Sequence, residues 1–327
     1  MADEQQRPRV AVLPQEGQDG LAGLDDVAGL ADFRVAHNAA ELGAALDGAQ
    51  VLLQWDFRSD ALGNAWDQAG SLEWIHAASA GVDAALTPQV RESDCVLTNA
   101  KGVFDRPIAE YVLGAMLMFA KDLHTSLAHQ RERRWQHRET LGLVGRRLLV
   151  IGAGGIGREI GRLAQAVGME VTVAARSARA DDEFGHIVGM DELDAALPAA
   201  DAVALCAPLT PETDGMIDAR RVGLLREDTW FINVGRGQLV DEPALAEGLR
   251  HGRIGAAALD VFAAEPLPES SPLWELPNVL ITPHMSGDLV GWRDALGAVF
   301  ADNLRRWLAG APLRNVVDKQ RGYVPGS

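Results

Sequence analysis

Three glycines in the middle of the sequence have the spacing of a phosphate-binding turn. Gly152, Gly154 and Gly157 lie between an apolar run at 147–151 and a helical pattern. The first permits a tight turn, the second lets backbone approach a pyrophosphate, and the third lets helix and strand pack closely. A ligand-free glycine turn is the alternative, and the strand and helix on either side disfavour it. We therefore expect a dinucleotide cofactor and a redox reaction, with Gly155 and Ile156 also contacting the cofactor.

The next apolar run, 171–174, is followed by basic and hydroxyl side chains. An NAD-selective site normally has Asp or Glu here to accept from the ribose 2′-hydroxyl. This chain has Arg176, Ser177 and Arg179 instead, which suit a 2′-phosphate. Surface charges without a ligand are the alternative. The pattern favours NADP(H) over NAD(H), with NAD(H) still possible.

The segments that must position these residues alternate between short apolar runs and longer amphipathic ones, which predicts an α/β fold with parallel sheets. A long apolar helix from about residue 107 then leads into the basic stretch 130–138, where a domain boundary is expected. The first set of predicted strands is 10–13, 51–54, 74–77 and 96–98, and the second is 147–151, 171–174, 202–206, 229–234, 255–260 and 279–282. The six later strands fit one doubly wound sheet.

Polar side chains follow three of the later strands: Arg236, Glu265 and His284. These segments, with those at 78–83 and 207–213, resemble the D-isomer-specific 2-hydroxyacid dehydrogenase family over nearly the whole chain. The resemblance implies a Rossmann doubly wound parallel sheet, residues 116–289, inserted into a smaller flavodoxin-like substrate domain, residues 1–115 plus 290–327. It also implies a homodimer.

The family's reaction is hydride transfer between NADP(H) and C2 of a small 2-oxoacid or D-2-hydroxyacid, and it gives each of these residues a role. A protonated imidazole can deliver a proton to the carbonyl oxygen near neutral pH, so His284 is the predicted acid, and the base in the reverse direction. Glu265 would hold the ring and favour its cationic form. Arg236 would bind the carboxylate and stabilise the developing alkoxide. For each of these residues considered alone, the alternative is an ordinary loop, turn or surface residue with no catalytic role.

The resemblance extends to residues outside this catalytic set. It implies that Ser79, Ala80 and Gly81 offer backbone N–H groups to the substrate carboxylate, beside Arg236 and His284; a plain turn is the alternative. Asp260 is expected at the nicotinamide carboxamide, or else as a cap. The remaining predicted cofactor contacts are Ala207, Pro208, Val234, His284 and Gly287.

The amino-acid composition argues against several classes of binding partner. The net charge of −16 and the pI near 4.9 disfavour nucleic acid. Cys95 and Cys206 lie in apolar runs, which predicts neither a disulfide framework nor a metal site. The first residues lack an apolar signal segment, and we find no stretch long enough to span a bilayer, so we expect a cytoplasmic protein with no membrane partner.

The sequence leaves several alternative functions open. A corepressor that uses the same fold as a dinucleotide-dependent binding module can retain the same residues. Phosphite dehydrogenase, as a remote possibility, and phosphoglycerate dehydrogenase are further alternatives. The short segment after Val317 is expected to leave no room for the regulatory domain that some phosphoglycerate dehydrogenases have. Met285 after His284 argues against formate oxidation. The strand-end arginines resemble NADP-dependent glyoxylate and hydroxypyruvate reductases, but glyoxylate, hydroxypyruvate, pyruvate and bulkier 2-oxoacids all remain candidate substrates.

Overall fold

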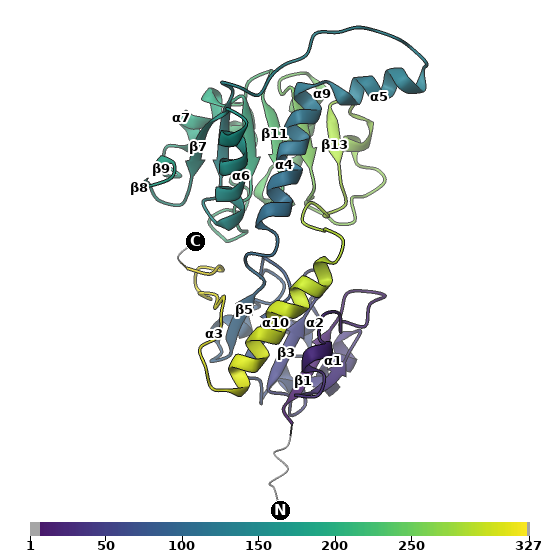
Figure 1. Cartoon of the computed structure of the whole chain (residues 1–327), viewed down its shortest axis with the longest axis vertical. Helices are drawn as coiled ribbons and strands as arrows, with labels where there is room; N and C mark the ends of the chain where they lie inside the picture. Colours follow the sequence, from purple (N-terminus) through teal and green to yellow (C-terminus); the bar gives the residue numbers. More distant parts are fainter. Residues whose placement is uncertain (1–6, 326–327) are drawn as a thin grey trace, which may run out of the picture. The chain divides into compact units, whose positions relative to one another are not determined.

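The computed structural model describes residues 7–325, which divide into two compact units (Figure 1). Unit 1 combines Met1–Val103 with Leu289–Ser327, and unit 2 is Phe104–Asp288. The first boundary therefore falls twelve residues earlier than the predicted one at 115, because helix α4 (Asp105–Ala120) packs along its length against α6 of unit 2. Both ends of the described chain, from residue 7 and to residue 325, lie in unit 1.

Unit 1 is built on a five-stranded parallel sheet in the order β2-β1-β3-β4-β5, the order of flavodoxin-like folds. One of its strands, β2, was not predicted. Its sequence, Asp-Phe-Arg-Val, alternates charged with apolar residues, which suits an edge position. The strands are β1 (Arg9–Leu13), β2 (Asp32–Val35), β3 (Val51–Gln54), β4 (Trp74–Ala77) and β5 (Val96–Asn99).

The helices of unit 1 come from both ends of the chain. They are α1 (Ala39–Leu46), α2 (Ala61–Asn64), α3 (Pro88–Glu92) and α10 (Trp292–Leu308), with short 3-10 turns at Asp25–Val27 and Trp66–Gln68. Phe300 of α10 is fully buried and its ring stacks on Trp74 of β4 at 5.2 Å between centroids. The C-terminal segment adds to this core because Val317 is buried and its N–H donates to Leu97 of β5.

A histidine lies fully buried within this core. His76 of β4 approaches Thr98 Oγ1 at 2.8 Å through Nδ1, and its ring packs 5.6 Å from that of Phe300. Within residues 7–325, its Nε2 atom has no hydrogen-bond partner. Burial lowers the pKa of His76 from 6.5 to about 3, because a charged imidazole would lose its hydration here. The folded protein therefore holds this ring neutral.

The neutral His76 makes stability depend on pH. Below pH 6.5 the unfolded chain binds a proton that the folded chain excludes until about pH 3, so the free energy of unfolding falls as pH falls. The slope rises toward about 1.4 kcal/mol per pH unit below pH 6.5, so acidification from 6.5 to about 4.5 is expected to remove about 2 kcal/mol of stability. Urea unfolding of the full chain across this range measures it.

The matched comparison uses two histidine variants. His76→Gln should flatten the pH dependence by that amount whatever its overall stability, whereas His137→Gln, at an exposed site, should leave it unchanged. Carboxylates that stabilise the fold contribute to both proteins and cancel in the comparison. An unaltered pH dependence in the His76 variant would show that the buried ring does not control acid stability.

Unit 2 is built on an eight-stranded sheet in the order β13-β12-β11-β10-β6-β7-β9-β8. All neighbours are parallel except the terminal β8–β9 pair, and the chain reverses direction across the sheet between β6 and β10, as in a Rossmann fold. The strands are β6 (Arg147–Ile151), β7 (Glu170–Ala174), β8 (Arg179–Asp181), β9 (Gly185–Val188), β10 (Ala202–Leu205), β11 (Trp230–Asn233), β12 (Ala256–Leu259) and β13 (Val279–Ile281). The prediction named six of these and missed β8 and β9.

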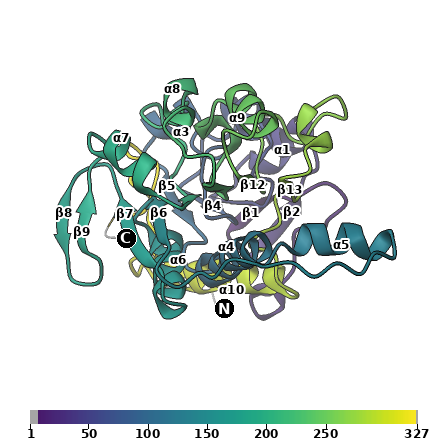
Figure 2. The same ribbon diagram turned by 90° about the horizontal axis from the view of Figure 1, so that it is seen from above.

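Helices cover both faces of this sheet. Figure 2 shows α4 and α6 (Gly155–Ala166) on one face and α8 (Ala219–Val222) and α9 (Glu242–Arg250) on the other, with α7 (Leu193–Ala196) at one side. Strands β10, β11 and β12 are consequently buried over their whole length, which explains their continuous apolar sequences. Among the helices of residues 7–325, none has the length and apolar character needed to cross a membrane.

One helix extends away from the body of unit 2. Helix α5 (Leu123–Arg131) and the long loop after it project outward in both views (Figures 1 and 2). The loop is tied back at its middle, where the Arg138 guanidinium donates to Asp122 and Ser126. Several apolar side chains of this segment, residues 123–146, lie in solvent: Leu123, Leu127, Trp135, Leu141 and Val144. We call this segment the α5 arm.

Candidate active site

The glycine turn between β6 and α6 has the backbone geometry that a dinucleotide requires. Gly152 has a φ of 125°, which side chains rarely tolerate. A Cβ at Gly157 would lie 1.8 Å from the carbonyl oxygen of Gly152, so helix and strand approach as closely as glycine allows. A Cβ at Gly154 would meet nothing within 4 Å, which leaves the turn open on the side where a pyrophosphate binds. The turn therefore fits the cofactor.

A carboxylate that the sequence analysis missed lies against this turn. A Cβ at Gly155 would lie 2.1 Å from Oδ2 of Asp105, the first residue of α4. A side chain at Gly155 would therefore displace the Asp105 carboxylate. Ile156 follows inside the first turn of α6, whose N-cap is Gly154. Asp105 precedes Gly155 by fifty residues, so no local pattern links them.

The residues predicted to bind a 2′-phosphate lie at the carboxyl end of β7. Arg176, Ser177 and Arg179 are all exposed there, and Arg179 begins β8. Two of the three acidic side chains that follow in sequence, Asp181 and Glu183, are bound by Arg158 of α6. The Arg158 guanidinium holds the pKa of Asp181 far below its ordinary value. The loop itself, residues 175–180, has two guanidinium groups and no carboxylate.

The other predicted cofactor residues lie at the ends of neighbouring strands. Ala207 and Pro208 follow β10, and the N–H of Ala207 lies 2.9 Å from the position of a Cβ on Gly152. Val234 follows β11 and is buried. Gly287 packs against Phe104, because a Cβ there would come within 2.6 Å of that ring. Ala207 is therefore next to the glycine turn, and all four lie in unit 2.

His284 and Glu265 form a hydrogen-bonded pair after β13 and β12. His284 Nδ1 lies 2.8 Å from Glu265 Oε2, and the two side chains are 22% and 15% exposed. The second oxygen, Oε1, accepts from the N–H of Phe262 at 3.0 Å. The carboxylate is thus fixed by backbone and in turn fixes the imidazole ring, with Nε2 on the side away from Glu265.

Asp260, at the end of β12, holds the loop that contains His284. Its carboxylate is buried and accepts from the N–H groups of Met285 and Ser286, both at 2.9 Å, and its carbonyl accepts from His284 N–H at 2.8 Å. Thr282 Oγ1 also donates to Oδ1. The predicted nicotinamide contact stays a prediction, while the bonds observed within the chain give Asp260 a positioning role.

Arg236 lies in the tight loop after β11. The buried Asn233 side chain accepts from Gly235 N–H and donates to the carbonyl of Arg236, both at 3.0 Å. A Cβ at Gly237 would come 1.8 Å from the carbonyl carbon of Phe262, so this loop is pressed against the segment that leads to Glu265. Arg236 and Glu265 therefore arise from loops in direct contact, and Asn233 was not predicted.

The predicted substrate loop is in unit 1, just after β4. Ser79 Oγ donates to the carbonyl of Gly81, and Asn99 of β5 donates to that of Ala80, both at 2.6 Å. The carbonyl groups of Ala80 and Gly81 are therefore hydrogen-bonded within unit 1. No acceptor within residues 7–325 is recorded for the N–H groups of Ala80 and Gly81. The loop therefore has backbone donors suited to a carboxylate.

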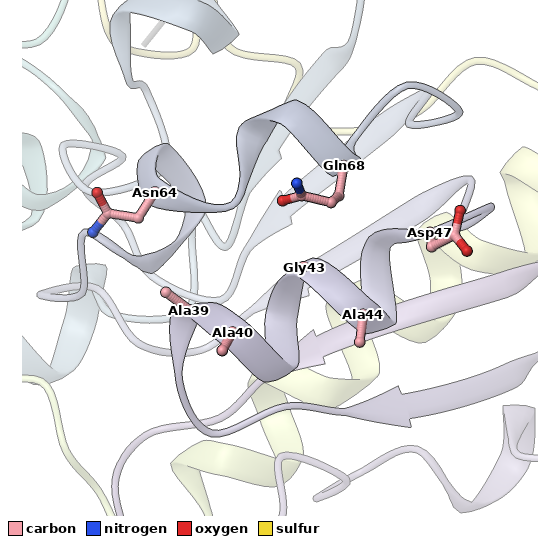
Figure 3. Close-up of a pocket in the computed structure, with 7 residues that line it drawn as sticks. All are labelled: Ala39, Ala40, Gly43, Ala44, Asp47, Asn64 and Gln68. Carbon is pink, nitrogen blue, oxygen red and sulfur yellow. The ribbon is translucent and has the colours of Figure 1, made fainter.

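A hollow elsewhere in unit 1 has none of these features. It measures about 500 Å³ and lies between α1 and the segment 64–68 (Figure 3). Small side chains of α1 form one side, and two amides form the other; its lining is Ala39, Ala40, Gly43, Ala44, Asp47, Asn64 and Gln68. It includes no predicted site residue. Likewise, the described part of the chain holds no group of three His, Cys, Asp or Glu side chains suited to a metal.

Comparison with known proteins identifies the family. Residues 113–286 match the model of the NAD-binding domain of D-isomer specific 2-hydroxyacid dehydrogenases. A D-3-phosphoglycerate dehydrogenase of Methanocaldococcus jannaschii is 32% identical over 257 residues, or 77% of this chain; the alignment spans about half, 48%, of that longer relative.

Two solved structures match almost end to end. A D-isomer specific 2-hydroxyacid dehydrogenase family protein from Aeromonas salmonicida has a TM-score of 0.83 and 32% identity, covering 96% of this chain and 99% of its own. An NADPH-dependent glyoxylate/hydroxypyruvate reductase from Sinorhizobium meliloti, in complex with NADP and sulfate, has a TM-score of 0.83 and 27% identity, covering 97% and 100%. The chain belongs to the D-isomer specific 2-hydroxyacid dehydrogenase family, whose members are NAD(P)-dependent oxidoreductases.

Proposed function

We propose that this protein reduces the C2 carbonyl of a small 2-oxoacid with NADPH, and oxidises the corresponding D-2-hydroxyacid in reverse. The observation that carries the proposal is the His284–Glu265 pair, 2.8 Å apart, in a loop at the edge of the sheet where Rossmann folds bind nicotinamide. A histidine paired through Nδ1 to a carboxylate is oriented to exchange a proton at Nε2.

Each chain residue then has a defined task. When bound, the reduced cofactor supplies the hydride. His284 holds a proton at Nε2 and gives it to the carbonyl oxygen, while Glu265 keeps the ring oriented. Arg236 binds oxygen atoms of the substrate and stabilises negative charge as it develops. The loop at Ser79, Ala80 and Gly81 offers backbone donors to a carboxylate.

A screen of substrates tests the proposal. The purified protein is mixed with NADPH or NADH and with glyoxylate, hydroxypyruvate, pyruvate, an aromatic 2-oxoacid and 3-phosphohydroxypyruvate, and absorbance of the reduced cofactor is followed. Turnover of at least one non-phosphorylated 2-oxoacid is expected. Selective turnover of the phosphorylated compound would favour the phosphoglycerate dehydrogenase reading. Tight cofactor binding without turnover would instead favour a corepressor-like binding module.

The preference for NADP(H) rests on Arg176 and Arg179. Each charge-assisted bond to a 2′-phosphate is worth about 1.5 kcal/mol at an exposed site. Replacing both arginines by alanine is therefore expected to lower kcat/KM for NADPH about 100-fold and to leave that for NADH within about threefold.

The control is Arg253→Ala, which removes an exposed arginine before β12, a strand in the other half of the sheet from β7. It should change neither value. An equal loss with both cofactors in the double variant would mean that these arginines do not read the 2′-phosphate. A wild-type protein that favours NADH by more than about tenfold would also contradict the proposal.

We also propose a cytoplasmic homodimer. Both cysteines, Cys95 and Cys206, are free thiols, as expected in a reducing compartment. The α5 arm supports the dimer, since Trp135 is 100% and Val144 82% exposed, and a second copy of the arm would cover such apolar side chains. Light scattering should give twice the chain mass of 35.0 kDa; a monomer at micromolar concentration would contradict the proposed dimer.

A further inference from the structure

The loop after β13 places His284 in an unusual backbone conformation. Its φ is 56°, in the left-handed region that glycine adopts freely and residues with a Cβ avoid. Such a conformation persists only where surrounding bonds impose it. The direction of the imidazole ring follows from this backbone, so whatever holds the loop also determines where Nε2 points.

The bonds that hold the loop converge on one buried carboxylate. Asp260 accepts from the N–H groups of Met285 and Ser286, the two residues after His284. Thr282, two residues before His284, donates its hydroxyl proton to Asp260 Oδ1 at 2.5 Å. Asp260 is only 1% exposed, so water does not substitute readily for a lost donor. The carboxylate therefore grips the loop on both sides of His284.

A second hydroxyl extends this chain of bonds to another element. Tyr111 of α4 lies 2.8 Å from Thr282 through its hydroxyl oxygen. The single proton of Thr282 is given to Asp260, so Tyr111 must be the donor in this bond. Burial raises the pKa of Tyr111 to about 12, and its hydroxyl consequently stays protonated at working pH. The proton order runs from Tyr111 to Thr282 to Asp260.

We propose that Tyr111 and Thr282 are positioning residues for the reaction, acting through Asp260 to hold His284 against Glu265. The inference rests on the proposed role of His284. Without the Thr282 hydroxyl, the Asp260 carboxylate loses one of its three hydrogen-bond donors, and the segment before His284 is released. Without the Tyr111 hydroxyl, the Thr282 hydroxyl loses the donor that fixes its rotation. Neither side chain needs to touch substrate or cofactor.

The test compares Thr282→Val with Thr282→Ser. Valine keeps the shape of threonine and removes the hydroxyl, and it is expected to lower kcat for the best 2-oxoacid between about 10- and 100-fold. Serine keeps the hydroxyl and should retain kcat within about threefold. KM for the 2-oxoacid and the Kd of NADPH should change much less than kcat in both, because Arg236, the glycine turn and the loop after β7 are untouched.

A double variant tests whether the two hydroxyls act as one chain. Tyr111→Phe alone should lower kcat by about tenfold, and adding it to Thr282→Val should produce little further loss. Multiplicative losses would mean that the two act independently and would overturn the chain. Equal kcat values for Thr282→Val, Thr282→Ser and wild type would also overturn it.

Crystal structures of the wild type and Thr282→Val provide a readout that does not depend on turnover. The expected change is displacement of residues 282–286 and loss of the 2.8 Å contact between His284 Nδ1 and Glu265. An unchanged loop would refute the positioning role even in an active enzyme. If the wild type reduces no 2-oxoacid but the loop still moves in the variant, the proposed function fails while the structural link stands.

Discussion

Replacing His284 by alanine is expected to lower kcat for 2-oxoacid reduction about 10³-fold while leaving NADPH affinity nearly intact. The imidazole is the group proposed to deliver a proton as negative charge grows on the carbonyl oxygen, and a proton donor in this position typically contributes between about 10²- and 10⁴-fold. Cofactor binding is proposed to rest mainly on the glycine turn and the loop after β7, which the substitution leaves in place.

The control for this experiment is another histidine–glutamate pair on the same unit. His251 on the surface lies 2.8 Å from Glu247 through Nε2, the distance also seen between His284 and Glu265. His251→Ala should therefore leave kcat unchanged, which separates loss of the catalytic group from loss of a similar ion pair. Steady-state kinetics and fluorescence titration with NADPH measure the two quantities. Near wild-type reduction of every accepted 2-oxoacid by the His284 variant would refute its assignment.

The central strands of both sheets were predictable because parallel strands buried on two faces require continuous apolar sequence. β10, β11 and β12 meet this condition over their full length. β2, β8 and β9 do not, because they lie at or next to sheet edges and have polar residues in a short span. The same apolar signal that finds a central strand is therefore absent from an edge strand.

Residues of the candidate site also differ in whether the sequence predicts their proximity. Arg236, Glu265 and His284 follow strands that end at one edge of a parallel sheet, so the order of strands in the sequence was enough to predict that they lie near one another. Tyr111 and Thr282 are 171 residues apart and Asp105 meets Gly155 between two helices. Contacts of this kind depend on how α4 packs on unit 2, which no local pattern specifies.

Asp260 illustrates what geometry adds to a motif. From the sequence, either a nicotinamide contact or a capping role is expected for Asp260. In the structure its two carboxylate oxygens accept bonds from Thr282, Met285 and Ser286 and are buried. The number of donors around a carboxylate cannot be read from sequence, because it depends on the conformation of the loop that approaches it.

The second large effect is expected at Arg236. Its guanidinium is proposed to bind the substrate's oxygen atoms and to stabilise the alkoxide as it forms, and removal of such a donor typically costs about 10²- to 10³-fold in kcat. Because Arg236→Ala also loses a contact to the carboxylate, kcat/KM for the 2-oxoacid should fall by about 10³-fold or more, near 4 kcal/mol. The Kd of NADPH should change little.

Arg236→Lys separates charge from geometry. Lysine keeps the positive charge but has no planar fork, so it cannot bind two oxygen atoms in parallel. The loop is rigid, since Asn233 holds the Arg236 carbonyl and Gly237 leaves no space beside Phe262, and the lysine ammonium cannot be repositioned by backbone movement. We expect lysine to recover no more than about tenfold of the kcat/KM lost in the alanine variant. A rise in KM with unchanged kcat in both variants would mean that Arg236 binds substrate and transition state equally and does not stabilise the alkoxide.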